Sequence, residues 1–132
     1  MNYIAYKYSN LKDKNSLISN LNKISDFLKE LNQETYILGR DYANWEIHKL
    51  GSLNSLPLMF KHIKRSDNII FYINSKVFSK GLITEFIFSK LLGKNCIFVY
   101  HDAPVNENLK FFGNIIAIDS IEQVREIKDF IK

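Results

Sequence analysis

Apolar and polar residues follow two different periods along this chain. Five short blocks are rich in β-branched and aromatic residues, which is typical of strands. These blocks cover residues 2–8, 35–38, 68–73, 96–100 and 114–118. Four longer blocks carry an apolar residue every three or four positions, the period of an amphipathic helix. Their predicted core positions are Leu17, Leu21, Ile24, Leu28 and Leu31; Leu56, Met59, Phe60 and Ile63; Ile83, Phe86, Ile87 and Leu91; and Ile121, Val124, Ile127 and Ile131.

A few residues indicate where the helices begin and end. Pro57 is expected in the first turn of its helix, where a missing backbone N–H is tolerated. Gly93 suits the end of the following helix, because a glycine accepts the left-handed conformation found there. Residues 39–53 show no clear period, and we expect a short helix around Trp45.

The alternation of strands with helices predicts an α/β fold. Residues 68–73 are almost continuously apolar, as expected of a central parallel strand that is buried on both faces. Five such units favour a flavodoxin-like, doubly wound, five-stranded parallel sheet of order 2-1-3-4-5 with helices on both faces. The 132 residues are expected to form one domain, residues 1–132.

Composition restricts the class of protein. No apolar run reaches the roughly 18 residues of a membrane span, and the first residues lack a signal-peptide pattern, so we expect a cytoplasmic protein with no membrane partner. Cys96 is the only cysteine and lies in a predicted strand, which favours a packed thiol. The three histidines show no ligand spacing, so neither a metal nor a cofactor is expected. The net charge is +4, but the lysines are scattered and arginine is rare, which makes a nucleic-acid partner unlikely.

The most informative segment is residues 75–85, which joins the central strand to the next helix. In an open parallel sheet, ligands bind beyond the carboxyl ends of the strands. Ser79 is predicted to cap the helix, whose free N–H groups attract an anion; Gly81 lets that anion approach, and Lys80 adds a charge. Glu85 lies about 9 Å along the helix axis from Ser79, within reach of a ligand bound at the helix end. A plain helix start and a solvated glutamate are the simpler alternatives.

Three pieces of the sequence carry a family resemblance: 67–73, the pattern Ser79-x-Gly81-x-x-x-Glu85, and 92–97. Together they resemble the nucleoside 2-deoxyribosyltransferase family, and more closely its branch that hydrolyses deoxynucleoside 5′-monophosphates. Residues 3–5 are similar to the family's aromatic-led first strand. The resemblance implies an enzyme that binds a nucleotide or nucleoside and cleaves or transfers its N-glycosidic bond. It assigns Glu85 as the nucleophile and Ser79 as a phosphate contact, and it implies a possible homodimer.

One departure from the family pattern concerns the catalytic acid. The family has a second aspartate eight residues before the strand-opening aspartate, and here that position is Met59. Asp41, Tyr6 or Tyr42 is a possible substitute in space. Tyr42, Asn44 and Trp45 belong to an aromatic segment that either stacks on a nucleobase or, in the case of Trp45, anchors the loop to the core. Tyr6, Tyr42, Asn44 and Trp45 therefore complete the predicted substrate site.

Two alternatives remain open at the level of the sequence. The chain also resembles Toll/interleukin-receptor-like (TIR-like) domains, which share the five-unit sheet and place a glutamate six residues after a serine. Some of those domains cleave NAD at its nicotinamide glycosidic bond. The replacement of an acid by Met59 also suits a non-catalytic module that senses a nucleotide or acts as an adaptor.

Overall fold

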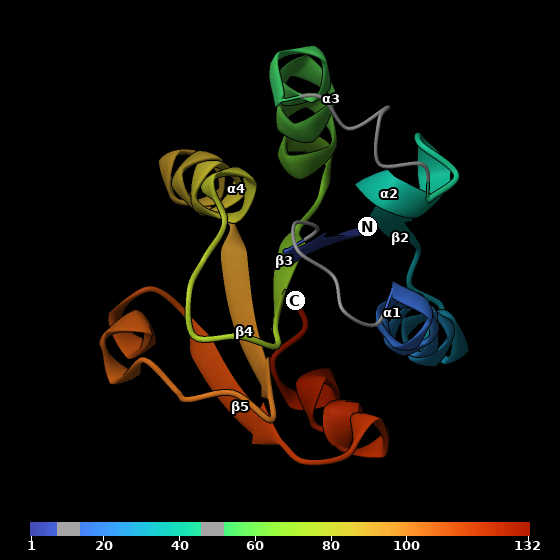
Figure 1. The fold of residues 1–132 in the computed structure, drawn as a ribbon, viewed down its shortest axis with the longest axis vertical. Coiled ribbons are helices and arrows are strands. Elements are labelled where there is room, and N and C mark those ends of the chain that lie inside the picture. Colours follow the sequence, from blue (N-terminus) through green and yellow to red (C-terminus); the bar gives the residue numbers. More distant parts are fainter. Residues whose placement is uncertain (8–13, 46–51) are drawn as a thin grey trace.

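Five parallel strands form one twisted sheet at the centre of the protein (Figure 1). The computed structural model of the chain describes residues 1–7, 14–45 and 52–132. The strands are β1 (Asn2–Tyr6), β2 (Thr35–Ile37), β3 (Asn68–Ile73), β4 (Asn95–His101) and β5 (Asn114–Ile118). Their order is β2-β1-β3-β4-β5, which confirms the predicted flavodoxin-like topology. The predicted first strand extended to Tyr8, which lies outside the described residues, as does His48.

Helices cover both faces of the sheet, as predicted. They are α1 (Lys14–Glu30), α2 (Leu38–Asp41), α3 (Ser52–Arg65), α4 (Lys80–Leu91), and the 3₁₀ helices η2 (Glu107–Phe111) and η3 (Ile121–Asp129). Figure 1 shows α3 and α4 on one side of the sheet, and α1 with the red η3 on the other. Three predictions are corrected. The short helix precedes Trp45, Pro57 lies inside α3 rather than in its first turn, and the closing helix has 3₁₀ geometry.

Strand residues alternate between two hydrophobic clusters. On the α1 and η3 side lie Ile4, Tyr6, Ile70 and Tyr72, together with Leu21 and Ile24 from α1. On the α3 and α4 side lie Tyr3, Ala5, Ile69 and Phe71, together with Ile63 and Leu82 from the helices. β1 and β3 are therefore buried on both faces, as expected of central parallel strands.

The inward face of α4 differs from the prediction. Ile83, Ile87 and Leu91 were expected in the core, but their exposed fractions are 45%, 48% and 77%. The buried residues of α4 are Leu82, Glu85 and Ser89 instead. Apolar residues surround this helix on nearly every side, so their spacing does not determine which side faces the sheet.

Two further predicted core residues are exposed. Phe60 on α3 is 40% exposed, and Leu31 is 37% exposed because α1 ends one residue before it. Met59 and Cys96 are buried, as predicted.

A row of asparagines closes the amino-terminal edge of the sheet. Asn2, Asn68 and Asn95 are aligned in register on β1, β3 and β4. The Asn68 amide donates to the side-chain oxygen of Asn2 at 2.8 Å, and the Asn95 amide donates to that of Asn68 at 2.7 Å. The amides also bond the backbone carbonyls of Lys132 and Phe130, at 3.0 and 2.8 Å. Because this edge is closed by structural hydrogen bonds, the carboxyl edge is the place to look for a site.

Candidate functional site

A buried carboxyl group lies between α4 and β1. Glu85 is 5% exposed and points from α4 toward the sheet. The Tyr3 hydroxyl donates a hydrogen bond to Oε2 of Glu85, although the two residues are 82 positions apart in the sequence. Tyr3 is completely buried. Within the described residues, no ion pair joins Glu85 to a cation. The alternative of a solvated glutamate is therefore wrong.

Burial controls the protonation of this pair. It raises the pKa of Glu85 to about 8, although the hydrogen bond from Tyr3 acts in the opposite direction. Burial and the neighbouring carboxyl raise the pKa of Tyr3 well above its ordinary value. Glu85 is therefore mostly protonated at neutral pH and ionises as the pH approaches 8.

The first turn of α4 has the features of an anion site. Ser79 caps the helix, as predicted, and its hydroxyl oxygen accepts a hydrogen bond from the Leu82 N–H at 3.2 Å. The hydroxyl proton stays free to be donated to a ligand. Lys80 is exposed, and this turn contains no acidic residue. Free N–H groups at a helix start attract anions, so this turn is suited to an anion. Roles for Ser79, Lys80 and Gly81 in binding stay predictions.

Gly81 and Met59 are neighbours across the α3–α4 contact. A Cβ atom placed on Gly81 would lie 4.0 Å from the Met59 methyl carbon, an ordinary van der Waals separation. Internal packing therefore does not require a glycine at position 81. Met59 is 8% exposed and brings a thioether to the place where the family resemblance led us to look for a carboxylate.

An aromatic stack supports Tyr3 from behind. The rings of Tyr3 and Tyr36 are stacked with centroids 6.0 Å apart, and Tyr36 stacks on His62 at 3.6 Å. Burial and the nearby Lys61 and Arg65 lower the pKa of His62, which keeps the imidazole neutral at physiological pH. The stack limits the positions that the Tyr3 ring can occupy, and so it orients the hydroxyl that holds Glu85.

The predicted aromatic segment forms a second group of residues. Tyr6 and Trp45 contact each other with ring centroids 6.3 Å apart, and both pack on the α1 side of the sheet, opposite Glu85. A side chain at Gly39 would overlap the Tyr6 hydroxyl, so a larger residue there would require the Tyr6 ring to move. This packing favours Trp45 as an anchor of the loop. Tyr42 and Asn44 are exposed, and a role for them in binding stays a prediction.

The sequence analysis missed a hydrogen-bonded chain at the carboxyl ends of β3 and β4. The Asn20 amide donates to the Tyr72 hydroxyl oxygen at 3.1 Å, and this hydroxyl lies 2.6 Å from Nδ1 of His101. Nε2 of His101 is 4.0 Å from Asp102. The sequence pointed to this contact only in that Tyr72 and His101, whose side chains can form hydrogen bonds, lie near the ends of apolar strands. Tyr3 was noted only as part of a first-strand resemblance.

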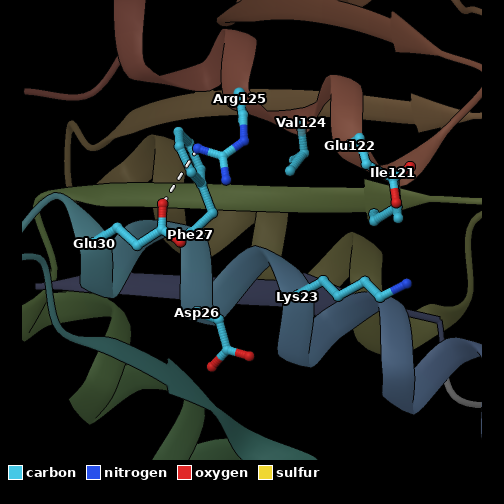
Figure 2. A pocket seen from close by; sticks show the side chains of 8 residues that line it. All are labelled: Lys23, Asp26, Phe27, Glu30, Ile121, Glu122, Val124 and Arg125. Atoms are coloured by element: carbon cyan, nitrogen blue, oxygen red, sulfur yellow. Dashed lines mark hydrogen bonds and ion pairs between the residues drawn. The ribbon is translucent and has the colours of Figure 1, made fainter.

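A hollow between α1 and η3 lies on the α1 side of the sheet (Figure 2). Glu85 belongs to α4, on the other side of the sheet. The volume of the hollow is about 210 Å³, and its floor is formed by Phe27, Ile121 and Val124. Arg125 reaches across it, bonds Glu30 at 3.2 Å and lies over the Phe27 ring, as Figure 2 shows. The arginine is thus already occupied by partners from its own chain.

The described residues also bear on metal binding and membrane association. Within the part of the chain that the structure describes, no group of three or more histidine, cysteine or acidic side chains is arranged to hold a metal ion. Across the same residues, no helix is both long enough and apolar enough to cross a bilayer.

Comparisons with known proteins support the fold. No protein-family model matches the sequence, and no curated protein matches it. The structure is similar to that of the CMP N-glycosidase BcmB from Clostridium botulinum, with a TM-score of 0.68, 16% identity, and coverage of 99% of this chain and 100% of that one. It is also similar to a 2-deoxyribosyltransferase from Bacillus psychrosaccharolyticus, with a TM-score of 0.64, 19% identity, and coverage of 94% and 89%. The fold implied by the family resemblance is therefore confirmed. These two structures give no support to the TIR-like alternative.

Proposed function

We propose that this protein binds a nucleotide or nucleoside and cleaves or transfers its N-glycosidic bond, with Glu85 as the nucleophile. The observation that carries the proposal is a buried carboxyl with no cationic partner among the described residues, held by Tyr3. Burying an uncompensated carboxyl destabilises a fold, so its presence points to a function. Two proteins of the same fold are named as enzymes of these two kinds, which supports the same chemistry here.

The proposed reaction has two steps, both at the anomeric carbon of the sugar. An anionic group on the substrate binds at the start of α4, and the sugar extends along the helix toward Glu85. The ionised carboxylate attacks the anomeric carbon, the bond to the base nitrogen breaks, and the base leaves with the bonding electron pair and takes up a proton. Water or a second base then attacks the anomeric carbon and releases Glu85. Met59 has no proton to give, so the leaving base takes its proton from water or from another side chain.

The first turn of α4 favours a substrate that carries a phosphate. Ser79 and Lys80 offer a hydroxyl and an ammonium group, and this turn has no carboxylate that would repel the phosphate. A nucleoside 5′-monophosphate suits this end of the site better than a free nucleoside.

The test is a release assay with purified protein. It is incubated with ribo- and deoxynucleoside monophosphates, free deoxynucleosides and NAD, and free base or nicotinamide is measured by chromatography. We expect base release from at least one monophosphate, and loss of this activity in Glu85→Gln. Glu122→Gln, an exposed carboxylate on η3, is the matched control and should retain activity.

Three other outcomes would contradict the proposal. Equal rates in the wild type and Glu85→Gln would remove Glu85 from the chemistry. A nucleotide that raises the melting temperature but is recovered unchanged would favour the non-catalytic sensing module. Cleavage of NAD alone would favour the TIR-like alternative.

The missing acid can be tested separately. Met59→Asp introduces a carboxyl on α3, at the sequence position where the family has its second aspartate. We expect this variant to release base faster than the wild type, because proton transfer to a leaving group typically contributes about 100-fold or more. A slower rate in a variant that remains folded would show that another group already supplies the proton.

We also propose that the protein works as a homodimer. The support is the family resemblance, together with an exposed apolar surface on the helix that carries Glu85.

A further inference from the structure

A pocket lined mainly by polar side chains lies beyond the amino ends of β3, β4 and β5. Its volume is about 420 Å³, within the roughly 300 to 1,000 Å³ that is typical of small-molecule sites. The asparagine row that closes this edge of the sheet lines one side of the pocket through Asn95 and does not fill it. Lys90, in the last turn of α4, also lines the pocket, whereas the helix begins at Lys80. About 15 Å of helix therefore separates this pocket from the anion site proposed at the start of α4.

Three lysines from different parts of the chain line the pocket: Lys90, Lys94 and Lys132. Backbone carbonyls hold the ammonium groups of the first two. Nζ of Lys90 donates to the carbonyl oxygen of Phe112 at 2.5 Å, and Nζ of Lys94 donates to that of Lys64 at 2.8 Å. A carbonyl takes up one of the three N–H groups of an ammonium and does not neutralise its charge. Each of these two lysines is therefore held in place with two hydrogen-bond donors left for a ligand.

Acidic side chains do not balance the charge of these lysines. Among the described residues that line the pocket, only Asp67 is acidic, and it pairs with the amino group of Met1 at 3.5 Å. Within the described part of the chain, neither Lys90 nor Lys94 forms an ion pair with a carboxylate. The side chains around the pocket thus carry three positive charges against one negative charge.

Capping of α4 does not account for the position of these lysines. Lysines are common at helix ends, because they compensate the free carbonyl groups there. In this helix the backbone N–H groups of residues 92–94 already donate to carbonyls of the last turns, and Gly93 takes the left-handed conformation of such an end, with φ +65°. Lys90 and Lys94 extend instead to carbonyls of other segments, on the two sides of the pocket.

We infer that this pocket binds a small compound that carries two or more linked phosphate groups. Phosphate oxygens accept several hydrogen bonds each, and the lysine ammonium binds them as a compact charge. A single carboxylate satisfies one lysine, whereas a chain of two or three phosphates reaches several of them. Phe112 also lines the pocket and is 44% exposed, so it offers an aromatic ring on which a nucleobase can stack. The phosphate chain is common to inorganic polyphosphates and to nucleoside di- and triphosphates.

This binding site goes beyond the proposed function and does not depend on it. The pocket lies at the end of α4, and the proposed reaction uses the start of the helix and Glu85. Binding is measured without turnover, so its presence or absence is independent of whether the protein releases a base.

The experiment is a calorimetric titration of the full chain with inorganic pyrophosphate, tripolyphosphate and ATP. The wild type should bind at least one of them, and added salt should weaken the binding, because the attraction is between charges near the surface. The double variant Lys90→Gln/Lys94→Gln should bind about tenfold more weakly or less, because two charge-assisted contacts are lost. The matched control is Lys14→Gln/Lys29→Gln, which removes the same charge from exposed positions of α1 and should bind like the wild type.

Two further measurements locate the binding. Lys80→Gln should leave the affinity for pyrophosphate unchanged, because Lys80 lies at the other end of α4. Acetylation mapping of the wild type covers the case in which the double variant fails to fold. Pyrophosphate should protect Lys90 and Lys94 from acetylation and leave Lys14 and Lys29 reactive.

The same titrations distinguish the two sources of the phosphate chain. Tighter binding of ATP than of tripolyphosphate, lost in Phe112→Leu, would support a nucleotide as the ligand. Equal binding of both, unchanged in Phe112→Leu, would support the phosphate chain alone.

Four results would overturn the inference. They are a wild type that binds none of the three compounds, a folded Lys90→Gln/Lys94→Gln that binds like the wild type, loss of binding in Lys80→Gln, and equal protection of all four mapped lysines. A single-stranded oligonucleotide that binds where the three small compounds do not would also overturn it, and would assign these lysines to a nucleic-acid surface.

Discussion

Replacing Glu85 by glutamine should make the protein more stable, by an amount that depends on pH. Burial raises the pKa of Glu85 from 4.5 to about 8. In the unfolded chain the carboxyl ionises near its ordinary value, so between these two pH values the folded state holds a proton that the unfolded state has released. The free energy of unfolding of the wild type therefore falls as the pH rises through this range. This loss of stability is absent below the pKa of Glu85 in the unfolded chain and complete above its pKa in the folded protein.

The magnitude follows from the size of the shift. A difference of about 3.5 pH units, at about 1.4 kcal/mol per unit, gives about 5 kcal/mol as an upper value. This is a large share of the roughly 5 to 15 kcal/mol that stabilises a typical domain. Glutamine has nearly the same shape, still accepts the hydrogen bond from Tyr3 and does not titrate. Glu85→Gln should therefore lack this loss of stability.

The assay is urea unfolding of the wild type and Glu85→Gln, followed by circular dichroism between about pH 5 and about pH 9. The variant should gain stability over the wild type steadily up to about pH 8, and the difference should then become constant. Glu122→Gln is the control, because the hydrogen bond from Ser120 lowers the pKa of this exposed carboxyl and no gain is expected across this range. Parallel curves for the wild type and Glu85→Gln would refute the claim that Glu85 is buried and uncompensated.

Three further predictions concern catalysis by the proposed site. The value of kcat/KM should rise with pH up to about 8 as Glu85 ionises. In Tyr3→Phe this rise should move to higher pH, because the variant loses the hydrogen bond that lowers the pKa of Glu85 in the wild type. An unchanged pH profile in Tyr3→Phe would show that Tyr3 does not act on Glu85. Ser79→Ala should lower the free energy of unfolding by about 1 kcal/mol, measured by urea unfolding, because it removes the helix cap. It should also raise KM more for a monophosphate than for the matching nucleoside. Equal effects on the KM of both substrates would exclude a phosphate contact. Gly81→Ala should retain or increase the melting temperature, because the site has room for a methyl group, but should raise KM for a monophosphate; an unchanged KM would mean that no anion approaches this residue.

Much of the fold follows from local sequence patterns. The boundaries of β3 and β5 agree with the prediction residue for residue, because each is a short apolar run bounded by polar residues. The strand order also agrees, since right-handed crossovers leave few ways to connect five parallel strands. Ser79 caps the start of α4 and Gly93 follows its end, both as predicted, because caps depend on the conformation of a single residue.

The candidate site was only partly predictable. Ser79, Gly81 and Glu85 were found because they lie close together in one strand-to-helix segment. Tyr3 could not be identified as the partner of Glu85, because 82 residues separate them and only the pairing of β1 with β3 brings them together. The contact between Tyr72 and His101 likewise depends on the pairing of β3 with β4.

The sequence by itself determined which residues form strands and helices, how the strands are ordered, and which segment carries the candidate chemistry. These properties depend on neighbours along the chain and on general rules of chain connection. Only the tertiary structure decided which side of α4 faces the sheet, and that choice buries Glu85 and exposes Ile83, Ile87 and Leu91. The physical reason is that a helix with apolar residues all round has no preferred side of its own. Its orientation is set by its packing against α3 and the sheet, and the same orientation buries Glu85 and raises its pKa.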